Sequence, residues 1–177
     1  ASEEETQPYY VNAPYGIILV HNGNLTNTRE LTAELYNVDR RHLNTHSDSE
    51  LLLNVLANEL QTSIAGLSLD ADQVFAAVTR LHERVEGTYA AIALVAGYGL
   101  VAFRDPNGIR PLVLGRRETE TGKEEWIVAS ESLVLESGGY EVVRDVEPGE
   151  AILISADGTM VSQQCAPQPK LVPCAFE

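Results

Sequence analysis

The sequence predicts a layered α+β domain. Its 177 residues are 44% hydrophobic and 21% charged, which is a globular composition at the length of one domain. The first half carries one short apolar run followed by segments with helical spacing, whereas the second half consists of short runs typical of strands. Strands that are apolar on both faces need helices to cover them, so we expect the elements to stack in layers.

One strand and three helices are predicted in the first half. The strand covers residues 15–21 (YGIILVH), and the Asn-Gly-Asn of residues 22–24 predicts a turn after it. The helices are expected over about 27–37, 48–61 and 71–86.

Capping signals set the expected ends of these helices. Asn27 with Glu30, and Ser47 with Glu50, have the spacing of a capping box, in which the first side chain caps the helix start. Gly87 stands where a left-handed residue often ends a helix.

The second half predicts six strands joined by tight links. They are expected at residues 89–95, 99–104, 111–115, 126–130, 151–155 and 160–164. Glycines at 97–99 and the Asp-Gly of 157–158 are typical of hairpins. After residue 164 the chain is rich in proline, so residues 165–177 predict an extended linker.

Charge excludes some classes of partner. The 26 acidic and 12 basic side chains give a net charge of −14, which argues against binding to nucleic acid or to an anionic membrane. The most apolar stretch, residues 89–103, is too short and too glycine-rich for a membrane span. The start lacks the pattern of a signal peptide, and Cys165 and Cys174 are too few for a disulfide framework, so we expect a cytoplasmic protein.

Two positions could carry chemistry. Asn22-Gly23 is either an ordinary turn or a pair of hydrogen-bond donors for an oxyanion, supplied by the Asn amide and the Gly backbone N–H. Asp48, in the first turn of a helix, either complements the helix dipole or receives a substrate ammonium group.

Metal and hydrolase motifs are weak. His42 and His46 are four residues apart but precede the predicted helix, so solvated loop histidines are favoured and no metal site is predicted. A serine-hydrolase elbow, a P-loop and a dinucleotide-binding glycine motif are absent from the sequence.

Five stretches together resemble one family. They are HNGNLTN at 21–27, THSDSE at 45–50, FRDPNGIRPLVLG at 103–115, VASES at 128–132 and PCAFE at 173–177. In this order they resemble the amidophosphoribosyltransferases, which are class II glutamine amidotransferases, over essentially the whole chain. The third stretch is the most specific of the five.

This resemblance implies a fold and a reaction. The fold would be the four-layer αββα sandwich of the N-terminal-nucleophile hydrolases. A glutaminase domain would release ammonia from glutamine, and a phosphoribosyltransferase domain would use it to make 5-phosphoribosylamine from phosphoribosyl pyrophosphate, the first step of purine synthesis. Asn22 and Gly23 would form the oxyanion hole, and Asp48 would bind the glutamine α-amino group.

The sequence departs from the family pattern at both ends. The family nucleophile is an N-terminal cysteine, whereas this sequence starts at Ala1, and no family arginine for the glutamine carboxylate precedes Gln7. We therefore expect a partial glutaminase domain over 1–164, incomplete at the N-terminus and inactive alone, with 165–177 as a linker toward an absent phosphoribosyltransferase domain.

Cofactor and partner expectations follow from the same resemblance. No cofactor is expected in this chain itself, and Mg²⁺ would belong to the absent domain. Some family members carry an iron–sulfur cluster, and Cys174 is either a lone thiol in the linker, which the cysteine count favours, or one ligand of such a cluster. The expected partners are glutamine, phosphoribosyl pyrophosphate in the absent domain, and either further copies of the parent enzyme or another chain that completes the sandwich.

Three alternatives stay open. The chain could be the glutaminase half of another class II amidotransferase, such as glucosamine-6-phosphate synthase, although residues 104–115 disfavour this. It could be a truncated glutamine-sensing or interaction module without catalysis. A metal-binding protein built on His42 and His46 is the third.

Overall fold

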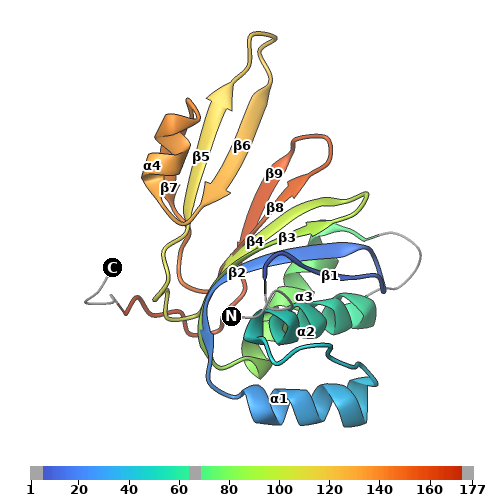
Figure 1. Ribbon diagram of the computed structural model, residues 1–177. Helices are drawn as coiled ribbons and strands as arrows, with labels where there is room; N and C mark the ends of the chain where they lie inside the picture. Colours follow the sequence, from blue (N-terminus) through green and yellow to red (C-terminus); the bar gives the residue numbers. More distant parts are fainter. Residues whose placement is uncertain (1–5, 64–68, 173–177) are drawn as a thin grey trace.

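Two antiparallel sheets form the framework of the molecule (Figure 1). The structure, a computed structural model, describes residues 6–63 and 69–172. The larger sheet has the order β1-β2-β3-β4-β8-β9, with strands Tyr9–Val11, Ile17–Leu25, Gly87–Val95, Gly99–Arg104, Glu150–Ser155 and Met160–Gln164. The smaller sheet has the order β6-β5-β7, with β5 at Val113–Glu118, β6 at Glu124–Ala129 and β7 at Glu141–Asp145.

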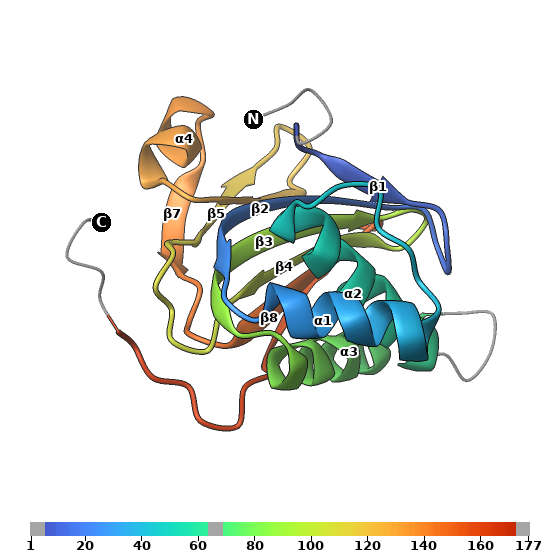
Figure 2. The ribbon, with the colours of Figure 1, turned by 60° about the horizontal axis from the view of Figure 1, so that its bottom comes forward.

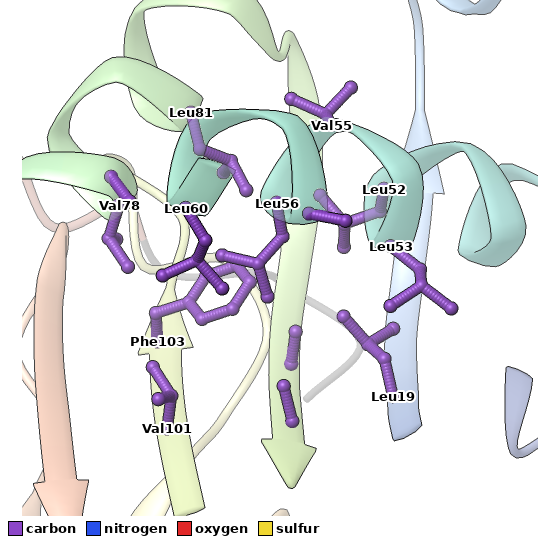
Figure 3. Packing of buried hydrophobic residues seen from close by; sticks show 14 of the residues in the cluster. Leu19, Leu52, Leu53, Val55, Leu56, Leu60, Val78, Leu81, Val101 and Phe103 are labelled. Atoms are coloured by element: carbon purple, nitrogen blue, oxygen red, sulfur yellow. The ribbon is translucent and has the colours of Figure 1, made fainter. Parts of the chain in front are cut away.

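Helices pack on one face of the larger sheet (Figure 2). They are α1 at Thr28–Glu34, continued by the π-helical η2 at Leu35–Asp39, α2 at Asp48–Ser63, and α3 at Ala71–Arg84. Alternation along β2 points Ile17 and Leu19 into this core and Ile18 away from it. Figure 3 shows Leu19 beside the leucines of α2, which are fully buried.

A second core lies between the two sheets. Its buried residues come from both of them and from the adjoining loops: Ala90, Ala102, Leu112, Leu114, Val146 and Ile152. Gly115, which follows Leu114 in β5, faces the other side of the smaller sheet. A Cβ on Gly115 would lie 2.5 Å from Leu135 of helix α4, Ser132–Ser137, so α4 packs on that side. The layers therefore run helix, sheet, sheet, helix, and the predicted layered fold with both helices and strands is confirmed.

The predicted turn at residues 22–24 is wrong. These residues continue β2 as far as Leu25, and Asn22 and Gly23 pair in register with Ala90 and Tyr89 of β3. The neighbouring strand satisfies the backbone there, which outweighs the turn preference of Asn-Gly. Gly87 likewise opens β3 instead of ending a helix, because α3 ends at Arg84 with Val85 already extended.

Neither predicted capping box closes, although Ser47 does cap α2: its Oγ accepts from the Ser49 N–H at 3.3 Å, and its carbonyl accepts from the Leu51 N–H at 3.2 Å. Asn27 donates to the carbonyl of Arg84 (2.8 Å) and accepts from the Glu86 N–H (3.0 Å), so its side chain joins α1 to the end of α3. Glu50 bonds the preceding loop at Asn44 instead of closing on Ser47. The Asn27 and Glu50 side chains bond groups that are distant in sequence or outside the helix, and local spacing does not reveal such partners.

The one capping box in the described part of the chain opens α3. Asp70 accepts from the backbone of Gln73, and the Gln73 side chain accepts from the backbone of Asp70.

Three short elements were not predicted from the sequence. They are β1, α4 and β7, of three, six and five residues. Elements this short carry too few residues to show a period. Helix α4 also exposes Leu133 and Val134, so its apolar residues do not form one stripe.

Residues 165–172 follow the body of the domain without regular structure. Cys165 is buried, and the backbone N–H groups of Lys170 and Val172 donate to the carbonyls of Pro106 and Asn107. The linker role of 165–177 stays a prediction. Ala1 and Cys174 lie outside the described residues. None of the described helices is long and apolar enough to span a membrane.

Truncation of the α2 core should be costly. Leu56 is fully buried between α2 and the larger sheet, so Leu56→Ala should lower the free energy of unfolding by about 2–5 kcal/mol through lost contacts and a residual cavity. Leu133→Ala is the matched control, because Leu133 is 66% exposed and should change stability by less than about 0.5 kcal/mol. Urea denaturation of both variants measures the difference, and equal losses would contradict this packing.

His82 should make stability depend on pH. Burial lowers the pKa of His82 to about 4, while its Nδ1 lies 2.8 Å from the Tyr89 hydroxyl. An unfolded histidine takes up a proton near pH 6.5 and the folded one does not, so folding stability should fall as the pH drops from about 6.5 to about 4. The loss should be on the order of 3 kcal/mol.

His82→Gln should flatten this part of the pH profile, measured by urea denaturation at several pH values. His42→Gln, on an exposed residue, should leave the profile unchanged. A wild-type slope retained in His82→Gln would assign the pH dependence to other groups.

Candidate functional site

The start of α2 is attached to the end of β2. Asp48 is the first residue of α2, and its Oδ2 accepts a hydrogen bond of 3.1 Å from the backbone N–H of Leu25, the last residue of β2. Its carboxylate also lies at the end of the helix where the dipole favours negative charge. The attachment brings Asp48 to the part of β2 that carries Asn22 and Gly23.

His21 of β2 and Ser49 of α2 make a second, buried contact between these two elements. Nδ1 of His21 lies 3.1 Å from Oγ of Ser49 and 3.9 Å from Oδ1 of Asp48. Burial lowers the pKa of the His21 imidazole, although the Asp48 carboxylate opposes this shift. Burial thus favours the neutral ring, which acts as a hydrogen-bonding support.

Gln7 closes the free edge of β2 beside His21. Its amide oxygen accepts from the His21 N–H at 2.6 Å, and its amide nitrogen donates to the His21 carbonyl at 2.8 Å and to Ser49 Oγ at 3.2 Å. Strand β1 starts only at Tyr9, so at His21 the Gln7 side-chain amide makes the two hydrogen bonds that a neighbouring strand would otherwise make.

The backbone of Gly23 faces the same edge. In a strand the N–H and C=O of alternate residues point to the same side, so those of 21, 23 and 25 point together. His21 bonds Gln7 and Leu25 bonds Asp48 at this edge, whereas Thr26 donates toward the other side, to Glu86. The Gly23 N–H therefore points away from β3, between the His21 N–H, which Gln7 accepts, and the Leu25 N–H, which Asp48 accepts.

Only glycine fits at position 23. Its φ is +148°, and a Cβ built there would lie 1.9 Å from the Thr88 carbonyl oxygen and 2.9 Å from Nε2 of His21. The close approach of β3 thus demands glycine, in addition to any need for open space in front of the N–H.

The structure brings the three predicted site residues to one end of β2. The Asn22 side chain points to the opposite face of the sheet from His21 and is exposed, and Gly23 and Asp48 are partly exposed. Sequence reasoning missed the supporting roles of Gln7, His21 and Ser49, whose contacts span 14 to 42 residues of the chain.

His42 and His46 are exposed in the segment before α2. Within residues 6–63 and 69–172, no group of three or more His, Cys, Asp or Glu side chains is placed to hold a metal ion.

Comparison with known proteins identifies the family of this chain. A family model described as "Glutamine amidotransferase domain" matches residues 1–137. Amidophosphoribosyltransferase of Pasteurella multocida is 58% identical over all 177 residues, which make up 35% of that protein. The chain spans about a third of the length of the curated relatives that it matches over its whole length.

Solved structures share the fold. Glutamine phosphoribosylpyrophosphate amidotransferase from B. subtilis superposes with a TM-score of 0.78 at 28% identity, covering 99% of this chain and 35% of that one. A predicted glutamine amidotransferase from Pseudomonas aeruginosa superposes with a TM-score of 0.62 at 13% identity, covering 91% and 66%, and shows the fold alone. This chain belongs to the glutamine amidotransferase domain family.

Proposed function

We propose that this chain is the glutaminase part of an amidophosphoribosyltransferase, which releases ammonia from glutamine for the synthesis of 5-phosphoribosylamine. The observation that carries the proposal is the outward Gly23 N–H next to Asn22, with the Asp48 carboxylate held at the same strand end. The relatives at 58% and 51% identity bear the name of that enzyme.

The roles follow from the charges that form during amide hydrolysis. Attack on the glutamine carboxamide puts negative charge on its oxygen, which the Asn22 amide and the Gly23 N–H would stabilise as two donors. Asp48 would accept the α-ammonium group of glutamine. Its bond to Leu25 uses Oδ2, while Oδ1 lies 3.9 Å from the His21 ring.

Cys165 is unsuited to the role of nucleophile. It is buried, and burial raises the pKa of its thiol, so the reactive thiolate is disfavoured. The family resemblance assigns this role instead to a cysteine at the mature N-terminus, whose own α-amine would act as the base.

The order of layers supports a finer fold assignment. Helix, sheet, sheet and helix follow one another through two separate cores, as expected for the αββα sandwich of the N-terminal-nucleophile hydrolases. The phosphoribosyltransferase partner domain, its Mg²⁺, the iron–sulfur cluster, oligomerisation and a cytoplasmic location stay predictions.

Asn22→Ala should abolish most glutamine-dependent synthesis in the full-length enzyme. Loss of one oxyanion donor lowers kcat by about 10²–10³-fold in comparable sites. Ammonia-dependent synthesis should persist, since it bypasses this site. Asn37→Ala, on an exposed helical residue, is the control and should leave both rates unchanged. An equal fall of both rates in Asn22→Ala would refute the assigned role.

Asp48→Asn should separate charge from structure. The amide oxygen can still accept from the Leu25 N–H, so the thermal midpoint should stay close to that of the wild type, whereas the lost charge should raise KM for glutamine at least about tenfold. Steady-state glutaminase assays of the full-length enzyme measure this change. An unchanged KM would remove Asp48 from glutamine binding.

A further inference from the structure

We propose that a pocket beside helix α1 binds a small phosphate ester or diphosphate. The pocket has a volume of about 640 Å³, within the range of small-molecule sites. Its walls come from α1, η2, the segment 41–47 and the first turns of α2, and they include none of Asn22, Gly23 and Asp48. It is therefore a second site, beyond the proposed glutaminase function.

The pocket is basic although the chain is strongly acidic. Arg29, Arg41, His42 and His46 line it, and no Asp or Glu does. The chain as a whole has 26 acidic against 12 basic side chains, so this lining runs against the overall composition. Guanidinium and imidazole groups are strong hydrogen-bond donors to phosphate oxygens.

Acidic side chains near the pocket are bound to other partners. Glu34 and Asp39 both pair with Arg84, at 3.2 Å and 2.7 Å. Glu50 accepts from the backbone N–H groups of Asn44 and Thr45 at 2.8 Å and 2.7 Å. These carboxylates are thus held by other donors. Within the basic lining, Arg41 already donates to the Ala13 carbonyl at 3.3 Å and to Gln61 Oε1 at 2.9 Å, so Arg29, His42 and His46 are the main donors for an external anion.

Glu50 also fixes the segment that forms one wall. It is buried, and burial raises its pKa, but hydrogen bonds from the backbone and side chains of Asn44 and Thr45 lower the pKa overall. The ionised carboxylate therefore stays as an acceptor of four bonds. The wall is shaped before any ligand arrives, which reduces the cost of binding.

Hydroxyl groups also line the pocket, and those of Thr32 and Thr45 already donate to the Thr28 carbonyl and to Glu50. The lining hydroxyl groups come from Thr28, Thr32, Tyr36, Thr45 and Ser47. Leu43 and Leu51 add an apolar wall, against which the organic part of an ester can pack. The His42 ring stands at 90° to the Tyr36 ring with centroids 4.9 Å apart, so these two groups support one another.

The lining discriminates against amino acids. A zwitterion brings an ammonium group that needs an acidic partner, and no lining residue is acidic. Glutamine therefore fits this pocket poorly, whereas a ligand that carries only negative charge fits it well.

Titration with inorganic pyrophosphate tests the proposal. In ¹H–¹⁵N NMR spectra, saturable shifts are expected in residues 28–32 and 42–47. Arg29→Gln should weaken binding about tenfold, because one charge-assisted hydrogen bond is lost from an exposed residue that the fold does not need. Arg116→Gln is the matched control, since it removes the same charge from a side chain that is 51% exposed on the smaller sheet. It should change the affinity less than about twofold.

Three results would overturn the proposal. They are the absence of saturable shifts in those residues, an equal loss of affinity in Arg29→Gln and Arg116→Gln, which would indicate a general charge effect, and displacement of pyrophosphate by glutamine. Inorganic phosphate, tested in parallel at constant ionic strength, should bind the same residues more weakly than pyrophosphate, because it offers fewer oxygens to the basic side chains of the lining.

Discussion

The attachment of α2 to the edge of β2 organises the molecule. Asp48 accepts a hydrogen bond from the Leu25 N–H, and Ser49 Oγ lies within hydrogen-bond distance of the His21 ring. These contacts join the first turn of α2 to the end of β2. The same contacts leave the Gly23 N–H pointing outward between capped neighbours. Structure and proposed function share these atoms, because the carboxylate that holds the strand is also the one placed for a ligand.

A network of ion pairs joins α3 to α1, η2 and α2. The Arg84 guanidinium bonds Glu34, Asp39 and Glu59, which belong to α1, η2 and α2. Glu59 also pairs with Arg80 of α3. Partly buried charges of this kind are costly when one partner is missing, so the network favours a single arrangement of the helices. It also draws two acidic groups away from the basic pocket.

Local charge differs from net charge in this protein. A value of −14 disfavours polyanions such as nucleic acid at the level of the whole surface. The pocket beside α1 shows that a small region can have the opposite character, because neighbouring carboxylates are bound to arginine or to backbone groups. Inferences from composition therefore apply to large partners and not to small ligands.

The sequence by itself determined the family, the layered class and the candidate residues Asn22, Gly23 and Asp48, because these depend on residue types in a fixed order. Only the tertiary structure decided that Asn22-Gly23 continues a strand, that Asn27 and Glu50 bond outside their helices, and that Gln7 caps His21. These outcomes depend on contacts with β3, α3 and the segment before α2. Local propensity is worth fractions of a kcal/mol per residue, and strand pairing and buried hydrogen bonds outweigh it.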